Sequence, residues 1–163
     1  MPRRAYLVRQ LQAGADAVQI FDTWAGVLPT EEFVQWCIEP DAAHRRDKCV
    51  RRCRERKSSA SRAAPARRSH IMSAQTAVDA VGLDWMIDRA FARDHVQSRV
   101  PVQGNLDPLA LVAGGAALDR AVDVVLEAFA GGPFIFNLGH GIVPETPIAH
   151  VERMLERVRR GKP

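Results

Sequence analysis

The chain of 163 residues is long enough for one domain with a hydrophobic core, and its hydrophobic fraction of 47% and charged fraction of 26% are ordinary for a globular protein. No apolar run approaches the roughly 18 residues that a membrane-spanning helix needs, and no apolar core of a signal peptide follows the first residues. Three cysteines are an odd number, which favours reduced thiols in the cytoplasm over a disulfide framework.

The net charge of +4 is distributed unevenly along the chain. Residues 41–70 contain 11 of the 23 lysines and arginines but 3 of the 19 acidic residues. The rest of the chain is therefore a mildly acidic, ordinary protein, and its basic character belongs to one internal segment.

The amino-terminal part predicts a helix, a buried strand and a second helix. Apolar residues gather on one face of a helix over 5–12, and Gly14 can end it. The apolar run 17–21, followed by small and polar residues, is typical of a buried strand that leads into a loop. Thr30 is a suitable N-cap for the second helix. The buried face of that helix is predicted from Phe33, Val34, Cys37 and Ile38.

The alternating pattern returns after residue 76. The predicted elements are a strand over 77–85, a short helix over 86–95, a strand over 100–108, an amphipathic helix over 116–130 and a strand over 134–138. Thr146 is predicted to cap a final helix that has Pro147 in its first position. The core face of this last helix is predicted from Ile148, Val151, Met154, Leu155 and Val158.

Strands and helices therefore alternate, which predicts an α/β fold with a parallel sheet covered by helices. Polar residues and glycines follow each strand directly, which is where a β/α barrel builds its sites. A complete barrel has eight such units in about 250 residues, so the chain corresponds to about half of one. We divide it into a first part of the half barrel (1–40), a basic segment (41–75) and a last part (76–163).

The basic segment does not fit this pattern. Residues 41–70 contain one large aliphatic residue, Val50, and no aromatic residue, so we expect disorder. A second interpretation is a basic arm that binds nucleic acid or an acidic surface, although the lack of interleaved aromatic residues argues against a platform for single strands. A metal site at His44, Cys49 and Cys53 would lack a fourth ligand. A third interpretation is that two compensating frame changes in a GC-rich gene flank this segment and have replaced a strand and a helix.

Taken singly, the polar residues at the strand ends allow more than one role. His140 lies between two glycines, as either a functional imidazole or an exposed loop residue. Asp84 is a general base or a solvated turn residue, and Thr23 is a site residue or a loop residue. Asp107 before Pro108 is best interpreted as a helix N-cap. Surface positions without ligand roles are expected for His44, His70, His95 and His150.

Together, four motifs resemble the uroporphyrinogen decarboxylase family and follow the family's order. They are GADAVQIFDTWAG over 14–26, GLDW over 82–85, QGNLDP over 103–108 and NLGHG over 137–141. The resemblance covers about residues 5–40 and 76–160 and fails between them. It implies the last half of a TIM (β/α)8 barrel, with one strand–helix unit lost in the basic segment.

The resemblance also implies a function. Family members remove carbon dioxide from the four acetate side chains of uroporphyrinogen to give coproporphyrinogen, in cytoplasmic haem biosynthesis. They use no metal or organic cofactor and are usually homodimers, and no nucleic-acid or membrane partner is implied. His140 matches a histidine that contacts substrate carboxylates, and Thr23 matches a serine that hydrogen-bonds one. Asp84, Gln103 and Asn105 are expected to line the cleft.

The departures from the family limit what this chain can do. The family's essential aspartate, its substrate-binding arginines and a tyrosine lie in the family's first half and have no counterpart here. We therefore assign no catalytic residue and predict no decarboxylase activity for this chain alone. The alternatives are a truncated non-catalytic fragment and a half that a separately encoded front half completes. Related corrinoid methyltransferases share the barrel but hold zinc in His and Cys motifs that the sequence lacks.

Overall fold

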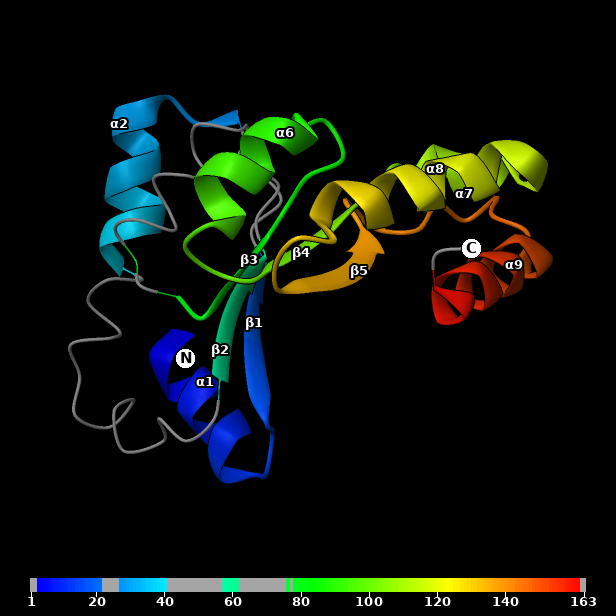
Figure 1. Ribbon diagram of the computed structural model, residues 1–163. Coiled ribbons are helices and arrows are strands. Elements are labelled where there is room, and N and C mark those ends of the chain that lie inside the picture. The colour runs from blue at the N-terminus through cyan, green and yellow to red at the C-terminus, as the bar shows by residue number, and fades with distance from the viewer. Residues whose placement is uncertain (1–2, 22–26, 41–56, 62–75, 77, 162–163) are drawn as a thin grey trace.

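The computed structural model describes residues 3–21, 27–40, 57–61, 76 and 78–161. Within these residues, five parallel strands form one sheet in which each strand lies beside its neighbours in the chain. The strands are β1 (Ala17–Phe21), β2 (Lys57–Ser61), β3 (Ala80–Gly82), β4 (Val102–Leu106) and β5 (Phe134–Leu138). Because all five are parallel, their carboxyl ends lie at the same edge of the sheet (Figure 1).

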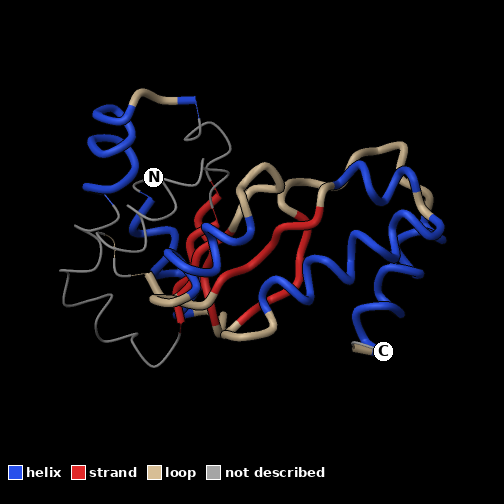
Figure 2. Tube along the Cα trace, turned by 45° about the horizontal axis from the view of Figure 1, so that its top comes forward, coloured by secondary structure: helices blue, strands red, loops and turns tan. Residues whose placement is uncertain are grey.

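Among the described residues, helical segments precede β1 and follow β1, β3, β4 and β5, as the tube in Figure 2 shows. In chain order they are α1 (Arg3–Gln12), α2 (Thr30–Phe33), the π-helix η2 (Val34–Ile38), α6 (Arg89–Ala92), the π-helix η3 (Arg93–Gln97), α7 (Pro108–Ala113), α8 (Gly115–Phe129) and α9 (Ile148–Arg160). Helix α8 packs against β4, β5, α7 and α9, whereas α1 contacts β1. The predicted α/β class with a parallel sheet is therefore confirmed.

The strongest sequence patterns predicted their elements closely. The strands predicted at 17–21 and 134–138 are β1 and β5, and the helix predicted at 116–130 is α8. The strand predicted over 77–85 is shorter, at Ala80–Gly82, because the chain turns at Asp84. The side-chain oxygen of Asp84 accepts a hydrogen bond from the backbone nitrogen of Met86 at 2.8 Å, which closes this turn.

The prediction that one strand had been lost is wrong. Lys57–Ser61 forms β2 between β1 and β3, with Ser59 opposite both Gln19 and Ala80. The expectation rested on the lack of an apolar run, whereas strand pairing uses backbone N–H and C=O groups that every residue except proline supplies. The remainder of the basic segment lies outside the described residues, so its disorder and the proposed frame changes stay predictions.

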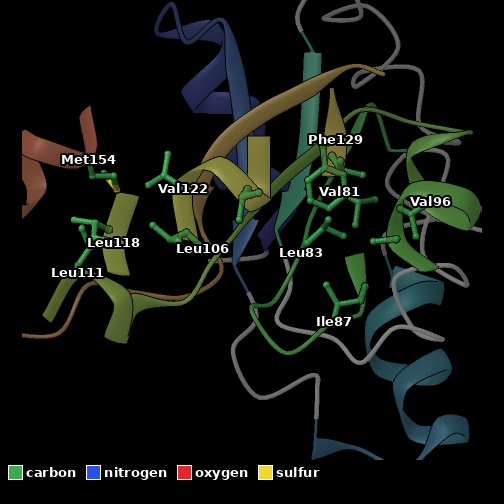
Figure 3. Packing of buried hydrophobic residues seen from close by; sticks show 13 residues of the cluster. Val81, Leu83, Ile87, Val96, Leu106, Leu111, Leu118, Val122, Phe129 and Met154 are labelled. Carbon is green, nitrogen blue, oxygen red and sulfur yellow. The ribbon is translucent and has the colours of Figure 1, made fainter. Parts of the chain in front are cut away.

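The main core fills the space between the sheet and the helices around α8 (Figure 3). The apolar face of α8 is completely buried at Leu118, Val122, Val125 and Phe129, which recur at helical spacing. Its neighbours in the core include Val81 from β3, Leu106 from β4, Val96 from η3, Leu111 from α7 and Met154 from α9.

A second, smaller buried cluster belongs to α2 and η2. It contains Phe33, Cys37 and Ile38, which agrees with the predicted face of this helical segment. Val78, just before β3, packs against both clusters and so joins them.

Helix α9 buries a narrower face than the sequence predicted. Met154 is buried, and Val151 and Val158 pack against the main core. Ile148 and Leu155 remain 78% and 41% exposed, so their assignment to the core is wrong. The physical reason is that α9 meets the core through Val151, Met154 and Val158, and its contacts with α7 and α8 do not cover Ile148 and Leu155.

The predicted helix caps were right in one case of three. Asp107 caps α7 by accepting a hydrogen bond from the backbone nitrogen of Leu109 at 2.9 Å. Helix α9 instead begins after Pro147, and the buried hydroxyl of Thr146 has no hydrogen-bond partner among the described residues. Thr30 is the first residue of α2 rather than its cap.

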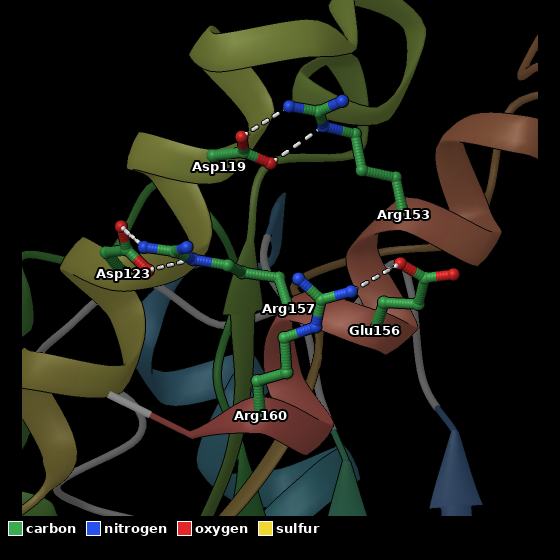
Figure 4. Close-up of polar contacts among 6 residues, drawn as sticks. All are labelled: Asp119, Asp123, Arg153, Glu156, Arg157 and Arg160. Carbon is green, nitrogen blue, oxygen red and sulfur yellow. Dashed lines mark hydrogen bonds and ion pairs between the residues drawn. The ribbon is translucent and has the colours of Figure 1, made fainter. Parts of the chain in front are cut away.

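Two ion pairs hold α8 and α9 together (Figure 4). Arg153 donates two hydrogen bonds to Asp119, at 2.8 and 2.5 Å, and Arg157 donates two to Asp123, both at 2.7 Å. Both carboxylates lie on one face of α8 and both guanidinium groups on one face of α9, because the partners are four residues apart on each helix. These hydrogen bonds lower the pKa of Asp119 and of Asp123.

Candidate functional site

The carboxyl ends of β3, β4 and β5 form the candidate site. Strand β4 lies between the other two, and its pairing extends past the strand ends on both sides. The backbone nitrogen of Leu83 donates to the carbonyl of Gln103 at 2.7 Å, and that of Gly139 donates to the carbonyl of Leu106 at 2.8 Å. The loops that follow β3 and β5 are therefore both fastened to β4.

His140 lies at this edge and is exposed. Its ring contacts the ring of Trp85, with a distance of 5.3 Å between the ring centroids and an angle of 56° between the planes. Gly139 makes this approach possible, because a β-carbon there would lie 2.7 Å from the α-carbon of Trp85 and still closer to its nitrogen. The two loops thus touch across the end of β4 and place an imidazole beside an indole.

Asp84 is buried and hydrogen-bonded within its own loop, whereas a general base needs a carboxylate that a substrate can reach. Its side chain is 5% exposed and closes the turn at Met86. Of the two roles that the sequence allowed, the geometry supports the turn residue, in a buried rather than a solvated position. Its carboxylate oxygen is directed at the backbone of its own loop.

Asn105 is completely buried and anchors the same loop from β4. Its amide nitrogen donates to the carbonyl of Asp84 at 3.3 Å and to that of Ile87 at 3.5 Å. Its amide oxygen accepts from Nε of Arg89 at 3.0 Å. Since a buried amide is stable only when its donors and acceptors are matched, this network fixes the loop that carries Trp85.

The remaining predicted residues are placed as follows. Gln103 is half buried in β4, opposite Gly82 on one side and Ile135 on the other. Thr23, the second predicted substrate contact, lies outside the described residues. The roles of Thr23, His140, Asp84, Gln103 and Asn105 toward a ligand stay predictions.

Two residues of this network were missed as candidates. Trp85 and Arg89 reach the site only through tertiary contacts, with His140 and Asn105 respectively. The available signal for Trp85 was that it belongs to GLDW, one of the four motifs, and follows a strand end just as Gly139 and His140 of NLGHG do.

The other histidines differ in their surroundings. His95 is exposed on η3 and contacts the ring of Phe91, at 4.5 Å between centroids. His150 is half buried, with Nδ1 at 2.6 Å from the carbonyl of Leu111, so the surface position predicted for it is wrong. His44 and His70 lie outside the described residues.

Within the described ranges, no group of three or more His, Cys, Asp or Glu is placed to hold a metal ion. In the same ranges, no helix has the length and apolar character needed to cross a membrane. The predicted absence of a cofactor is not tested by either observation.

The sequence profile of the family described as uroporphyrinogen decarboxylase (URO-D) matches residues 4–161. The chain belongs to the uroporphyrinogen decarboxylase family. Proteins named uroporphyrinogen decarboxylase from Chelativorans sp. (strain BNC1) and Sphingopyxis alaskensis are each 51% identical to it, over 161 and 157 residues. One from Agrobacterium fabrum is 47% identical over 158 residues.

The chain is shorter than these uroporphyrinogen decarboxylases. The alignments cover 94–96% of the chain but 44–45% of each relative, so the chain spans less than half of their length. A solved methyltransferase from Methanosarcina mazei has a similar fold, with a TM-score of 0.73 over 96% of this chain and 45% of that protein. At 16% identity, this likeness concerns the fold alone.

Proposed function

We propose that the chain forms about half of a β/α barrel and supplies part of the porphyrinogen-binding site of a uroporphyrinogen decarboxylase. The reaction is loss of carbon dioxide from the four acetate side chains of uroporphyrinogen, which gives coproporphyrinogen. The observation that carries the proposal is the convergence of GLDW, QGNLDP and NLGHG at one sheet edge, with His140 exposed there. Membership of the family supplies the substrate class.

His140 and Thr23 are the proposed contacts to substrate carboxylates. An imidazole N–H donates a hydrogen bond in either protonation state, and a hydroxyl donates one as well, so both suit carboxylate oxygens. A substrate with many carboxylates needs several such donors, and the described part of the site offers one exposed imidazole. We therefore infer that other parts of a complete barrel supply the remaining donors and the proton-transfer chemistry.

An exposed apolar residue in β5 supports the proposal that other parts of a barrel complete the site. Ile135 in β5 is 50% exposed although it stands in a strand, and β5 is paired on one side only within the described residues. A closed barrel has no free edge and fills its interior with side chains. The proposal thus includes a remainder of the barrel that covers Ile135, together with the homodimer and cytoplasmic location that the family implies.

Binding and turnover can be tested separately with the 163-residue chain. We expect no coproporphyrinogen from uroporphyrinogen III in a chromatographic assay of the chain alone. We expect uroporphyrin III, the oxidised octacarboxylate, to bind in a titration that follows its own fluorescence. His140→Ala should weaken this binding about tenfold, as for loss of one charge-assisted hydrogen bond, whereas His95→Ala should leave it unchanged.

Two results would contradict the proposal. Equal binding by the His140→Ala and unchanged chains would remove His140 from the carboxylate site. Coproporphyrinogen production by the purified chain alone would show that the division of the chemistry between two parts is wrong.

A further inference from the structure

The contact between Trp85 and His140 is not explained by the core of the molecule. Trp85 is half buried and His140 is exposed, so their rings meet at the rim of the sheet. The glycines on both sides of His140 have no side chains that could pack against the imidazole. A neighbouring ring is therefore the main described restraint on where this imidazole points.

Trp85, in contrast, is held firmly by its own loop. Asn105 binds the carbonyls of Asp84 and Ile87, which bracket Trp85 in the sequence. The carboxylate of Asp84 binds the backbone nitrogen of Met86, the residue that follows Trp85. Because Asn105 is fully buried in β4, the backbone that carries the indole is tied to the sheet itself.

We propose that Trp85 is a positioning residue, which holds the His140 imidazole in the orientation that receives a carboxylate of the substrate. This inference rests on the proposed function, since it requires His140 to contact a carboxylate. Tilted aromatic pairs attract one another beyond simple burial, and orienting a donor in advance reduces the loss of freedom on binding. Trp85 acts through His140, and this role requires no direct contact between Trp85 and the ligand.

The test combines a spectroscopic signature with binding. In the 163-residue chain, nuclear magnetic resonance reports the His140 ring protons, which the indole ring current shifts. We expect Trp85→Leu to move these resonances and to weaken uroporphyrin III binding about three- to tenfold, the range expected for one aromatic pair. Trp85→Phe keeps an aromatic ring and should retain most of the affinity while still moving the resonances.

The chain offers a matched control in Trp36. It is 60% exposed on η2, and its indole nitrogen donates to Glu32 at 2.6 Å. Trp36→Leu removes the same side chain and should change neither the His140 resonances nor the affinity. A double-mutant cycle with His140→Ala then separates positioning from direct contact. Once the imidazole is absent, Trp85→Leu should cause almost no further loss of uroporphyrin III affinity.

The outcomes distinguish the two proposals. The proposed function fails, and this inference with it, if the unchanged chain does not bind uroporphyrin III. The same holds if His140→Ala binds it as tightly as the unchanged chain does. If His140→Ala weakens binding but Trp85→Leu moves neither the resonances nor the affinity, the inference alone is overturned. Additive losses in the double variant would also overturn it. Should Trp85→Leu fail to fold, Trp85→Phe carries the same test through its resonance shift.

Discussion

At the residue scale, Gly139 is a position where one added carbon has a specific consequence. A β-carbon there would lie 2.7 Å from the α-carbon of Trp85 and 2.8 Å from its β-carbon. Because the backbone on both sides is fastened to β4, neither loop can move away easily. Gly139→Ala should therefore lower the free energy of unfolding by about 1–3 kcal/mol, as measured in urea.

Gly141, two residues further on, is the matched control for that substitution. Apart from Gly141 itself and its two chain neighbours, no described residue has an atom within 4 Å of the position of its missing β-carbon. Gly141→Ala should change stability by less than about 1 kcal/mol. Equal effects of the two substitutions would show that the loops after β3 and β5 are not in close contact.

Asn105 permits a second prediction at the same scale. Asn105→Ala leaves two buried backbone carbonyls and the Arg89 side chain without their partner, at a cost of about 1–3 kcal/mol in urea unfolding. Asn137 occupies the opposing position in β5 and is exposed, so Asn137→Ala should cost less than about 0.5 kcal/mol. Similar costs would mean that Asn105 does not anchor the loop.

At the scale of elements, the pairing of α8 with α9 depends on pH. The hydrogen bonds from Arg153 and Arg157 lower the pKa of Asp119 and of Asp123 in the folded chain. A carboxylate with a lowered folded pKa stabilises the fold above its unfolded pKa of about 3.9, and this contribution is lost as the pH falls through the folded pKa.

The measurement compares the unchanged chain with the double variant Asp119→Asn, Asp123→Asn. The melting temperature of the variant should be lower at neutral pH. The difference should begin to shrink below about pH 4, the unfolded pKa of a carboxylate, and should vanish as the pH falls through the lowered folded pKa of Asp119 and Asp123. Glu156→Gln serves as the control, because its pair with Arg160 is exposed and 3.3 Å long. A difference that persists unchanged in acid would show that the carboxylates act through packing instead of charge.

The same scale shows how far the sequence predicts this fold. Elements β1, β5 and α8 were predicted because each carries a complete apolar pattern of its own. Strand β2 was missed because its residues are small and polar, and its place is set by the neighbouring strands. Ile148 was assigned to the core because periodicity identifies an apolar face but not how much of it a partner covers.

The candidate site likewise combines local features that the sequence predicts with contacts between distant segments that it does not. The exposed position of His140 after a strand could be predicted from one loop, since the strand and the two glycines are local features. Its contact with Trp85 could not, because residues 55 positions apart meet only through the order of the strands. The buried network of Asn105 likewise joins residues of two strand ends, and no local pattern marks it.

At the scale of the whole molecule, the origin of the basic segment and the coverage of less than half of the relatives' length are tested by different experiments. The frame-change interpretation predicts that the DNA for residues 41–75, translated in another frame, encodes an apolar strand followed by an amphipathic helix. The rest of the chain needs no such change, because its motifs and its structured elements agree. If neither alternative frame yields that pattern, the segment is an authentic part of the protein.

The last prediction starts from the coverage of less than half of the relatives' length and concerns the side of β5 that no described strand pairs. If this chain is one half of a barrel, the part of the Chelativorans sp. relative that the chain does not match should complete it. Mixing the two purified polypeptides should then yield coproporphyrinogen from uroporphyrinogen III, measured by chromatography, although neither produces it alone.

Variants on two sides of the chain make this experiment specific. Ile135→Lys places a charge on the exposed face of β5 that the missing strands would cover, and it should abolish the restored activity. Val124→Lys lies on α8, where the side chain is 47% exposed, and it should leave that activity unchanged. If the mixture that contains the Ile135→Lys chain still forms product, barrel completion at β5 is contradicted. Failure of the mixture to form any product would instead favour a truncated, non-catalytic member of the family.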